Sequence, residues 1–177
     1  MTMRSIIVTF ICLFMIFEWA NAQKIKRNEV DKFTKKHVIE TSFERIHANI
    51  LNNRNVWIAL KNVDGNEWLR LKWCCDEVLS VDKGAEVIFL DNEENTYIFK
   101  NTKYTLSGKG EGTIGLSGSA MYGLDLWLKG DISMLENRCI KGMRIYTNDG
   151  YVDFKISESN SKKISKTYKV YKKAVFQ

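Results

Sequence analysis

The sequence predicts a mainly β protein: an antiparallel β-sandwich-like domain with one short helix and a C-terminal amphipathic helix. Short runs rich in Val, Ile, Thr, Trp, Tyr and Phe recur from residue 37 onward, separated by Gly, Asn and Asp. Asp64-Gly65, between two alternating segments, is typical of a β-hairpin turn. Near the end of the chain, apolar side chains recur at helical spacing among lysines: Ile164, Tyr168, Tyr171 and Val175.

Residues 1–22 are predicted to be a signal peptide. Arg4 precedes an apolar run, residues 6–17, and Ala20-Asn21-Ala22 has the small-x-small pattern that precedes cleavage. Twelve residues rise only about 18 Å as a helix, against about 30 Å of hydrocarbon, which disfavours an uncleaved membrane anchor. We therefore expect cleavage after Ala22 and a periplasmic or extracellular protein with no transmembrane span.

The mature chain is expected to hold one β-rich domain, residues 37–177, after a mobile basic leader, residues 23–36. Asp131 is expected to cap a short helix that runs to Asn137, and the last helix is expected over residues 158–174, with a final strand as the alternative. Strands are expected over residues 38–50 (one or two), 55–63, 67–75, 85–90, 96–100, 103–107, 121–128, 139–147 and 151–156.

The formal net charge of +6 is concentrated at the two ends of the mature chain. Residues 23–37 carry net +4 and residues 155–177 net +6, whereas residues 38–154 carry net −4. Nucleic-acid binding requires a clustered basic face, so we expect no nucleic-acid partner. The lysines at the C-terminus favour a solvated helix face over attraction of anionic lipid or other polyanions.

Glycines gather in residues 108–123, where Gly110 to Gly115 satisfy the pattern G-x-G-x-x-G. A dinucleotide site needs a helix directly after these glycines, and the following Leu-Ser-Gly-Ser-Ala is a poor helix. We therefore expect no cofactor here and interpret the segment as a loop or as bulged strands, with a binding loop as the alternative.

Catalytic and metal motifs are absent from the sequence. Ser117 and Ser119 do not lie in G-x-S-x-G, only His37 and His47 are available as histidine bases, and no metal-ligand spacing occurs. We predict no catalytic residue and no metal. A hydrolase with paired carboxylates remains the enzymatic alternative, because such carboxylates come from distant positions in a sequence.

Three cysteines remain after cleavage: Cys74, Cys75 and Cys139. Cys74 and Cys75 are adjacent, so their thiols point to opposite faces of a strand. A Cys75–Cys139 disulfide is one alternative, and three thiols are the other.

Three tryptophans suggest the one binding hypothesis. Trp57 and Trp68 flank the Asp64-Gly65 turn out of phase with the leucine and isoleucine positions, and Trp127 lies in a later strand. If that face is exposed, the three side chains form a flat stacking platform of the kind that sugar-binding modules use. The alternative is a two-layer sandwich in which these rings pack under a helix.

Two separated motifs carry a family resemblance: Asp31-x-Phe33-Thr34 with residues 39–42 (Ile-Glu-Thr-Ser), and residues 143–151 (Met-Arg-Ile-Tyr-Thr-x-Asp-Gly-Tyr). The chain resembles a large group of small exported proteins of unknown function from gut Gram-negative anaerobes. The resemblance implies an exported β-rich domain and assigns no catalytic residue. We expect a non-catalytic binding protein for a glycan or another envelope protein, with a carboxylate hydrolase or an inhibitor-like envelope partner as alternatives.

Overall fold

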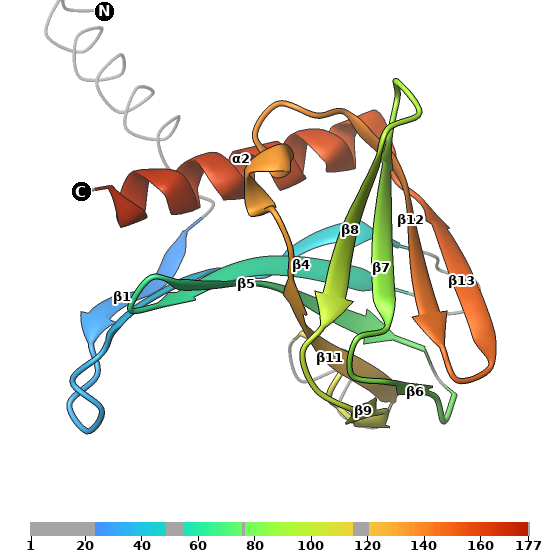
Figure 1. The fold of residues 1–177 in the computed structure, drawn as a ribbon, viewed down its shortest axis with the longest axis horizontal. Coiled ribbons are helices and arrows are strands. Elements are labelled where there is room, and N and C mark those ends of the chain that lie inside the picture. The colour runs from blue at the N-terminus through green and yellow to red at the C-terminus, as the bar shows by residue number, and fades with distance from the viewer. Residues whose placement is uncertain (1–23, 49–54, 76, 115–120, 177) are drawn as a thin grey trace, which may run out of the picture.

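The computed structural model describes residues 24–48, 55–75, 77–114 and 121–176; the predicted signal peptide lies outside these ranges. Within them the fold is mainly antiparallel β-sheet with a C-terminal helix, which confirms the predicted fold class (Figure 1). The elements are β1 (Ile25–Val30), β2 (His37–Thr41), β3 (Glu44–His47), β4 (Val56–Val63), β5 (Asn66–Cys74), β6 (Ser80–Val81), β7 (Glu86–Asp91), β8 (Thr96–Asn101), β9 (Thr105–Leu106), β10 (Gly108–Lys109), β11 (Tyr122–Lys129), the 3₁₀-helix η2 (Ile132–Leu135), β12 (Ile140–Thr147), β13 (Gly150–Lys155) and α2 (Glu158–Val175).

One large sheet runs in the order β1-β2-β4-β5-β11-β8-β7-β12-β13, with β3 added to β4 and β10 to β11. The sheet is strongly curved, so strands far apart in this order meet across its inner face (Figure 1). The rings of Trp73 in β5 and Phe154 in β13 pack edge to face with centroids 5.3 Å apart. His47 of β3 hydrogen-bonds through Nδ1 to the Lys155 carbonyl at 2.9 Å. A single curled sheet thereby produces sandwich-like packing.

Helix α2 lies across the inner face of the sheet, over β2, β3 and β4 (Figure 1), and completes the core. Ser157 caps the helix by accepting a hydrogen bond from the Asn160 amide, and the predicted stripe of Ile164, Tyr168 and Tyr171 is buried. On the sheet side, the core includes the alternate inward residues of β5 and β11, each at most 1% exposed: Leu69, Leu71, Trp73, Leu124, Leu126 and Leu128. Burial of each such side chain contributes about 1.5–3 kcal/mol.

The two predicted hairpins are present. Asp64 and Gly65 have φ values of 50° and 80°, the left-handed geometry that a two-residue turn between twisted strands requires. The turn sets Val63 opposite Asn66 and thereby fixes the register of β4 against β5. In the second hairpin, Thr147 pairs with Gly150 across a two-residue turn between β12 and β13.

Two sequence expectations are wrong. Residues 25–30 of the expected mobile leader form β1, which pairs with β2, and Ile25 packs against the core. Residues 103–107 do not continue the neighbouring meander, because Thr105–Leu106 pairs with Ser80–Val81 in a separate two-stranded sheet. In the described ranges, no helix has the length and apolar character needed to cross a membrane.

The described part of the glycine-rich segment packs closely on the sheet. Gly108–Lys109 pairs with the start of β11, and the next turn lies against the backbone of β5 and β11. A Cβ on Gly112 would lie only 2.1 Å from the Trp73 carbonyl oxygen, so glycine is required at that contact. Residues 115–120 lie outside the described ranges.

Candidate functional site

The outward positions of the central strands carry aromatic and charged side chains. The inward positions of β4, β5 and β11 hold core residues, so the side chains between them point to the outer face. The register sets Arg70 directly opposite Trp127 on the neighbouring strand. Contacts join eight residues into what we call the outer-face cluster: Glu40, Phe43, Lys61, Trp68, Arg70, Lys72, Asp125 and Trp127.

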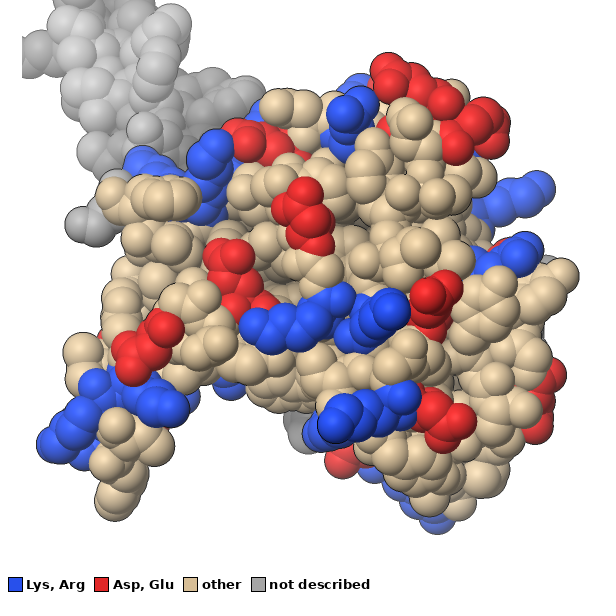
Figure 2. Space-filling model, in the orientation of Figure 1, with Lys and Arg blue, Asp and Glu red and all other residues tan. Residues whose placement is uncertain are grey.

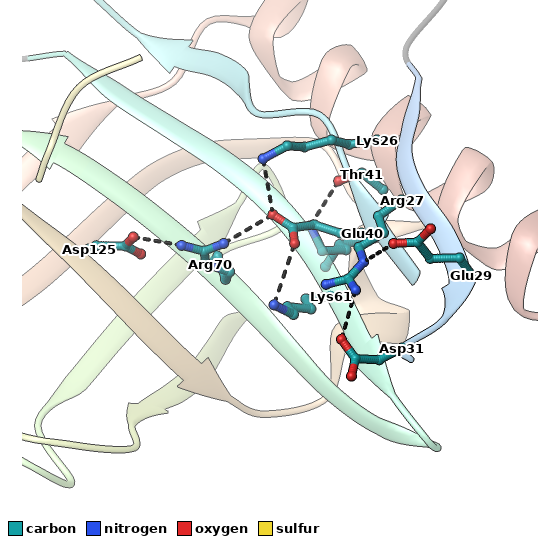
Figure 3. Close-up of polar contacts among 10 residues, drawn as sticks. Lys26, Arg27, Glu29, Asp31, Glu40, Thr41, Lys61, Arg70 and Asp125 are labelled. Atoms are coloured by element: carbon teal, nitrogen blue, oxygen red, sulfur yellow. Dashed lines mark hydrogen bonds and ion pairs between the residues drawn. The ribbon is translucent and has the colours of Figure 1, made fainter. Parts of the chain in front are cut away.

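Arg70 bridges two carboxylates at the centre of the outer-face cluster (Figure 3). Its Nη1 donates to Glu40 Oε1 at 3.1 Å and its Nη2 to Asp125 Oδ2 at 2.6 Å. Lys61 pairs with Glu40 at 3.4 Å, and Lys72 pairs with Asp125 at 3.6 Å. These five side chains are only 8–17% exposed, so each charge depends on its partner and the network is held in place.

A row of rings and cations crosses the same face. The Arg70 guanidinium lies between the Phe43 ring, 5.1 Å from its centroid, and the Trp127 ring, 4.4 Å away. Trp127 meets Trp68 at a centroid distance of 6.1 Å and an interplanar angle of 76°. Trp68 and Trp127 therefore come together as the hypothesis requires, but edge to face rather than as a flat platform.

Trp57 lies on the same outer face but lines a cavity of about 650 Å³ rather than joining the tryptophan pair. Phe43 belongs both to this cavity and to the outer-face cluster, so the two features adjoin. Met121 and Ile114 add apolar surface to the cavity, and Lys163 reaches it from α2. The cavity extends the outer-face cluster with a hollow of mixed polar and apolar lining.

A second cavity of about 650 Å³ lies on the other half of the sheet. Its lining includes the apolar residues Ile88 and Leu90 and the uncovered backbone of Gly142. Its charged rim is internally paired, since Arg144 hydrogen-bonds to Asp153 at 2.7 Å. The outer-face cluster differs from this cavity by combining a pair of tryptophan rings with several charged side chains.

The enzymatic alternative requires two carboxylates with space between them for a substrate. In the outer-face cluster, Glu40 and Asp125 are brought together, but the Arg70 guanidinium occupies the space between them. Both oxygens of Glu40 and Oδ2 of Asp125 are paired with cations, which leaves no room for a scissile bond. This pair therefore fits a structural or binding role better than a catalytic one.

The histidines hold structural positions. His37 Nε2 lies 2.7 Å from the Asn28 side-chain oxygen, and His47 contacts the Lys155 carbonyl and the Phe154 ring. Neither interaction presents the imidazole to a serine or cysteine nucleophile. Among the residues that the structure describes, no cluster of three or more His, Cys, Asp or Glu side chains suits a metal ion.

The Cys75–Cys139 disulfide alternative is not what the structure shows: Cys74, Cys75 and Cys139 are thiols. Cys75 Sγ donates to the Glu77 carbonyl at 3.3 Å, whereas Cys139 Sγ accepts from Asn92 in the β7–β8 turn at 3.1 Å. The two thiols are thus held by separate parts of the sheet.

Sequence reasoning identified Trp68 and Trp127 but missed Glu40, Arg70 and Asp125. The alternation of apolar and polar residues in β5 predicts that Arg70 points away from the core, and this pattern was the one signal in the sequence that indicated its outer position. Its partners lie 30 and 55 residues away along the chain, so only the strand order brings them together.

The chain was compared with family models, curated proteins and solved structures, and none of them matches it.

Proposed function

We propose that the chain is an exported, non-catalytic glycan-binding module whose site is the outer-face cluster with the adjoining Trp57 cavity. The observation that carries the proposal is the row formed by Phe43, Arg70, Trp127 and Trp68 across the outer face. Trp and Arg are the residue types that contribute most often to binding hot spots. We infer a sugar as the ligand because aromatic rings lie next to charged groups that form hydrogen bonds. Such a surface suits a ligand that has both apolar faces and polar edges.

The ion pairs support binding by fixing the site before a ligand arrives. Arg70 is held on two sides by Glu40 and Asp125 and on two further sides by rings. A side chain held in this way loses little rotational freedom on binding, which lowers the cost of association. The signal peptide predicted from the sequence favours a periplasmic or extracellular location for such a module.

The experiment is a titration of residues 23–177 with neutral and acidic soluble polysaccharides, followed by calorimetry and tryptophan fluorescence. Trp127→Ala is expected to weaken binding about 30-fold, because removal of a central aromatic hot spot costs about 2 kcal/mol. Tyr151→Ala is the matched control, since Tyr151 is an aromatic residue 56% exposed on another strand. Circular dichroism checks that both variants fold. Absence of binding to every polysaccharide, or equal loss in both variants, would refute the proposal.

A further inference from the structure

The outer-face cluster and its neighbours carry an excess of positive charge. Among the described residues, six cations and two carboxylates are joined there by ion pairs or cation–π contacts. The cations are Lys26, Lys61, Arg70, Lys72, Lys103 and Lys129, and the carboxylates are Glu40 and Asp125. On the face of the molecule seen in Figure 2, acidic and basic side chains are interspersed. The local excess favours a ligand of negative charge.

Two of these cations contact rings instead of the carboxylates of the cluster. Lys103 lies 5.9 Å from the centroid of Trp127, and Lys129 lies 4.3 Å from that of Trp68. An indole ring attracts an ammonium group but carries no net charge, so it positions the cation without neutralising it. Each ammonium also has three N–H donors. Lys103 and Lys129 are exposed and can therefore donate to an incoming oxyanion.

The positive charges are spread over a distance that suits a chain rather than a single ion. The cations come from β1, β4, β5, β11 and the segment before β9, and β1-β2-β4-β5-β11 are consecutive strands of the sheet. Strands lie about 4.8 Å apart, so the cations from β1 to β11 span about 19 Å. A small anion would meet one or two of them, whereas a linear polymer with repeated anionic groups would meet several.

From these observations we propose that the ligand of the outer-face cluster is an acidic polysaccharide, bound through its carboxylate or sulfate groups. This inference rests on the proposed glycan-binding function and narrows it to one class of glycan. Single-stranded nucleic acid is the other linear polyanion, and the experiment includes it as a competing outcome.

The first two probes are polygalacturonate and its methyl-esterified form, which share a backbone and differ in the charge of the carboxylate. Heparin tests sulfate groups, and poly(dT) tests single-stranded nucleic acid. Residues 23–177 should bind polygalacturonate or heparin and bind the esterified polymer at least tenfold more weakly, a difference of about 1.4 kcal/mol. Raising NaCl from about 0.01 M to about 1 M should abolish binding, because the screening length falls from about 30 Å to about 3 Å.

Two matched variants test the location of the site. Lys103→Gln/Lys129→Gln should weaken binding about fivefold, since each exposed ion pair contributes about 0.5 kcal/mol. Lys169→Gln/Lys173→Gln removes the same charge from the exposed face of α2 and should leave affinity unchanged.

The outcomes separate the two proposals. Equal binding of the esterified polymer would overturn the acidic preference and leave glycan binding standing, whereas failure of every polysaccharide would overturn both. Poly(dT) binding as tight as polygalacturonate, or equal loss in the two lysine variants, would also overturn the inference.

Discussion

Replacement of Arg70 by methionine is expected to destabilise the fold by about 3 kcal/mol. The substitution removes two short charge-assisted hydrogen bonds, to Glu40 at 3.1 Å and to Asp125 at 2.6 Å. Each such bond contributes about 1.5–3 kcal/mol, and the loss of one partner from a buried ion pair costs about 3–5 kcal/mol. Lys61 and Lys72 remain beside the two carboxylates and offset part of the loss, so the lower end of that range applies.

Urea unfolding followed by circular dichroism measures this cost, and a second variant isolates its cause. Glu40→Gln/Arg70→Met/Asp125→Asn removes the stranded charges together with the cation, so it should recover at least half of the lost stability. If Arg70→Met lowers the free energy of unfolding by less than about 1 kcal/mol, solvent screens these ion pairs as strongly as it screens salt bridges on an exposed surface. A triple variant no more stable than the single one would refute the assigned cause.

Three further predictions test other parts of the structure. Tyr171→Phe should lower the free energy of unfolding in urea by about 1–2 kcal/mol, because Tyr171 is buried and its hydroxyl accepts a hydrogen bond from Asn62. Burial also raises the pKa of Tyr171 above its usual value. The pKa of Asp31 should be about 2 by NMR titration, lowered from 3.8 mainly by hydrogen bonds in the following turn. The contribution of the Asp31 carboxylate to folding stability should therefore be complete above about pH 4 and lost as the pH falls toward 2. Asp31→Asn should remove this part of the loss of stability in acid. Gly112→Ala should lower the free energy of unfolding by about 1–3 kcal/mol, because the added Cβ would lie 2.1 Å from a backbone atom. Gly142→Ala is the control: its Cβ would lie 3.6 Å from the nearest atom, so it should change stability by less than about 0.5 kcal/mol. Equal effects of the two substitutions would contradict the close packing at Gly112.

The strands and the last helix could be predicted because local patterns encode them. Leu69, Leu71 and Trp73 alternate with polar residues, and the Asp64-Gly65 turn fixes the hairpin register. Strand β1 could not be found in this way. Four of its six residues are exposed, so pairing with β2 rather than an apolar face holds it in the sheet.

The candidate site depended on information that local patterns lack. Outward tryptophans were visible in the sequence, but the angle of 76° between Trp68 and Trp127 arises from the packing of β5 against β11. The ion pairs of Arg70 likewise depend on the order of the strands. The sequence composition predicts the net charge of long stretches of the chain. It does not predict the positive excess on the outer face, because those side chains come from several strands that are separated in the sequence.

Chemical-shift mapping during a titration with oligogalacturonate tests binding at the outer-face cluster most directly. The indole N–H signals of Trp68 and Trp127 and the amides of outward positions on β4, β5 and β11 should shift together and saturate. The indole N–H of Trp73, which is buried on the opposite face, should stay unchanged. Shifts confined to α2, or no saturable shift at either outer tryptophan, would contradict binding at this face.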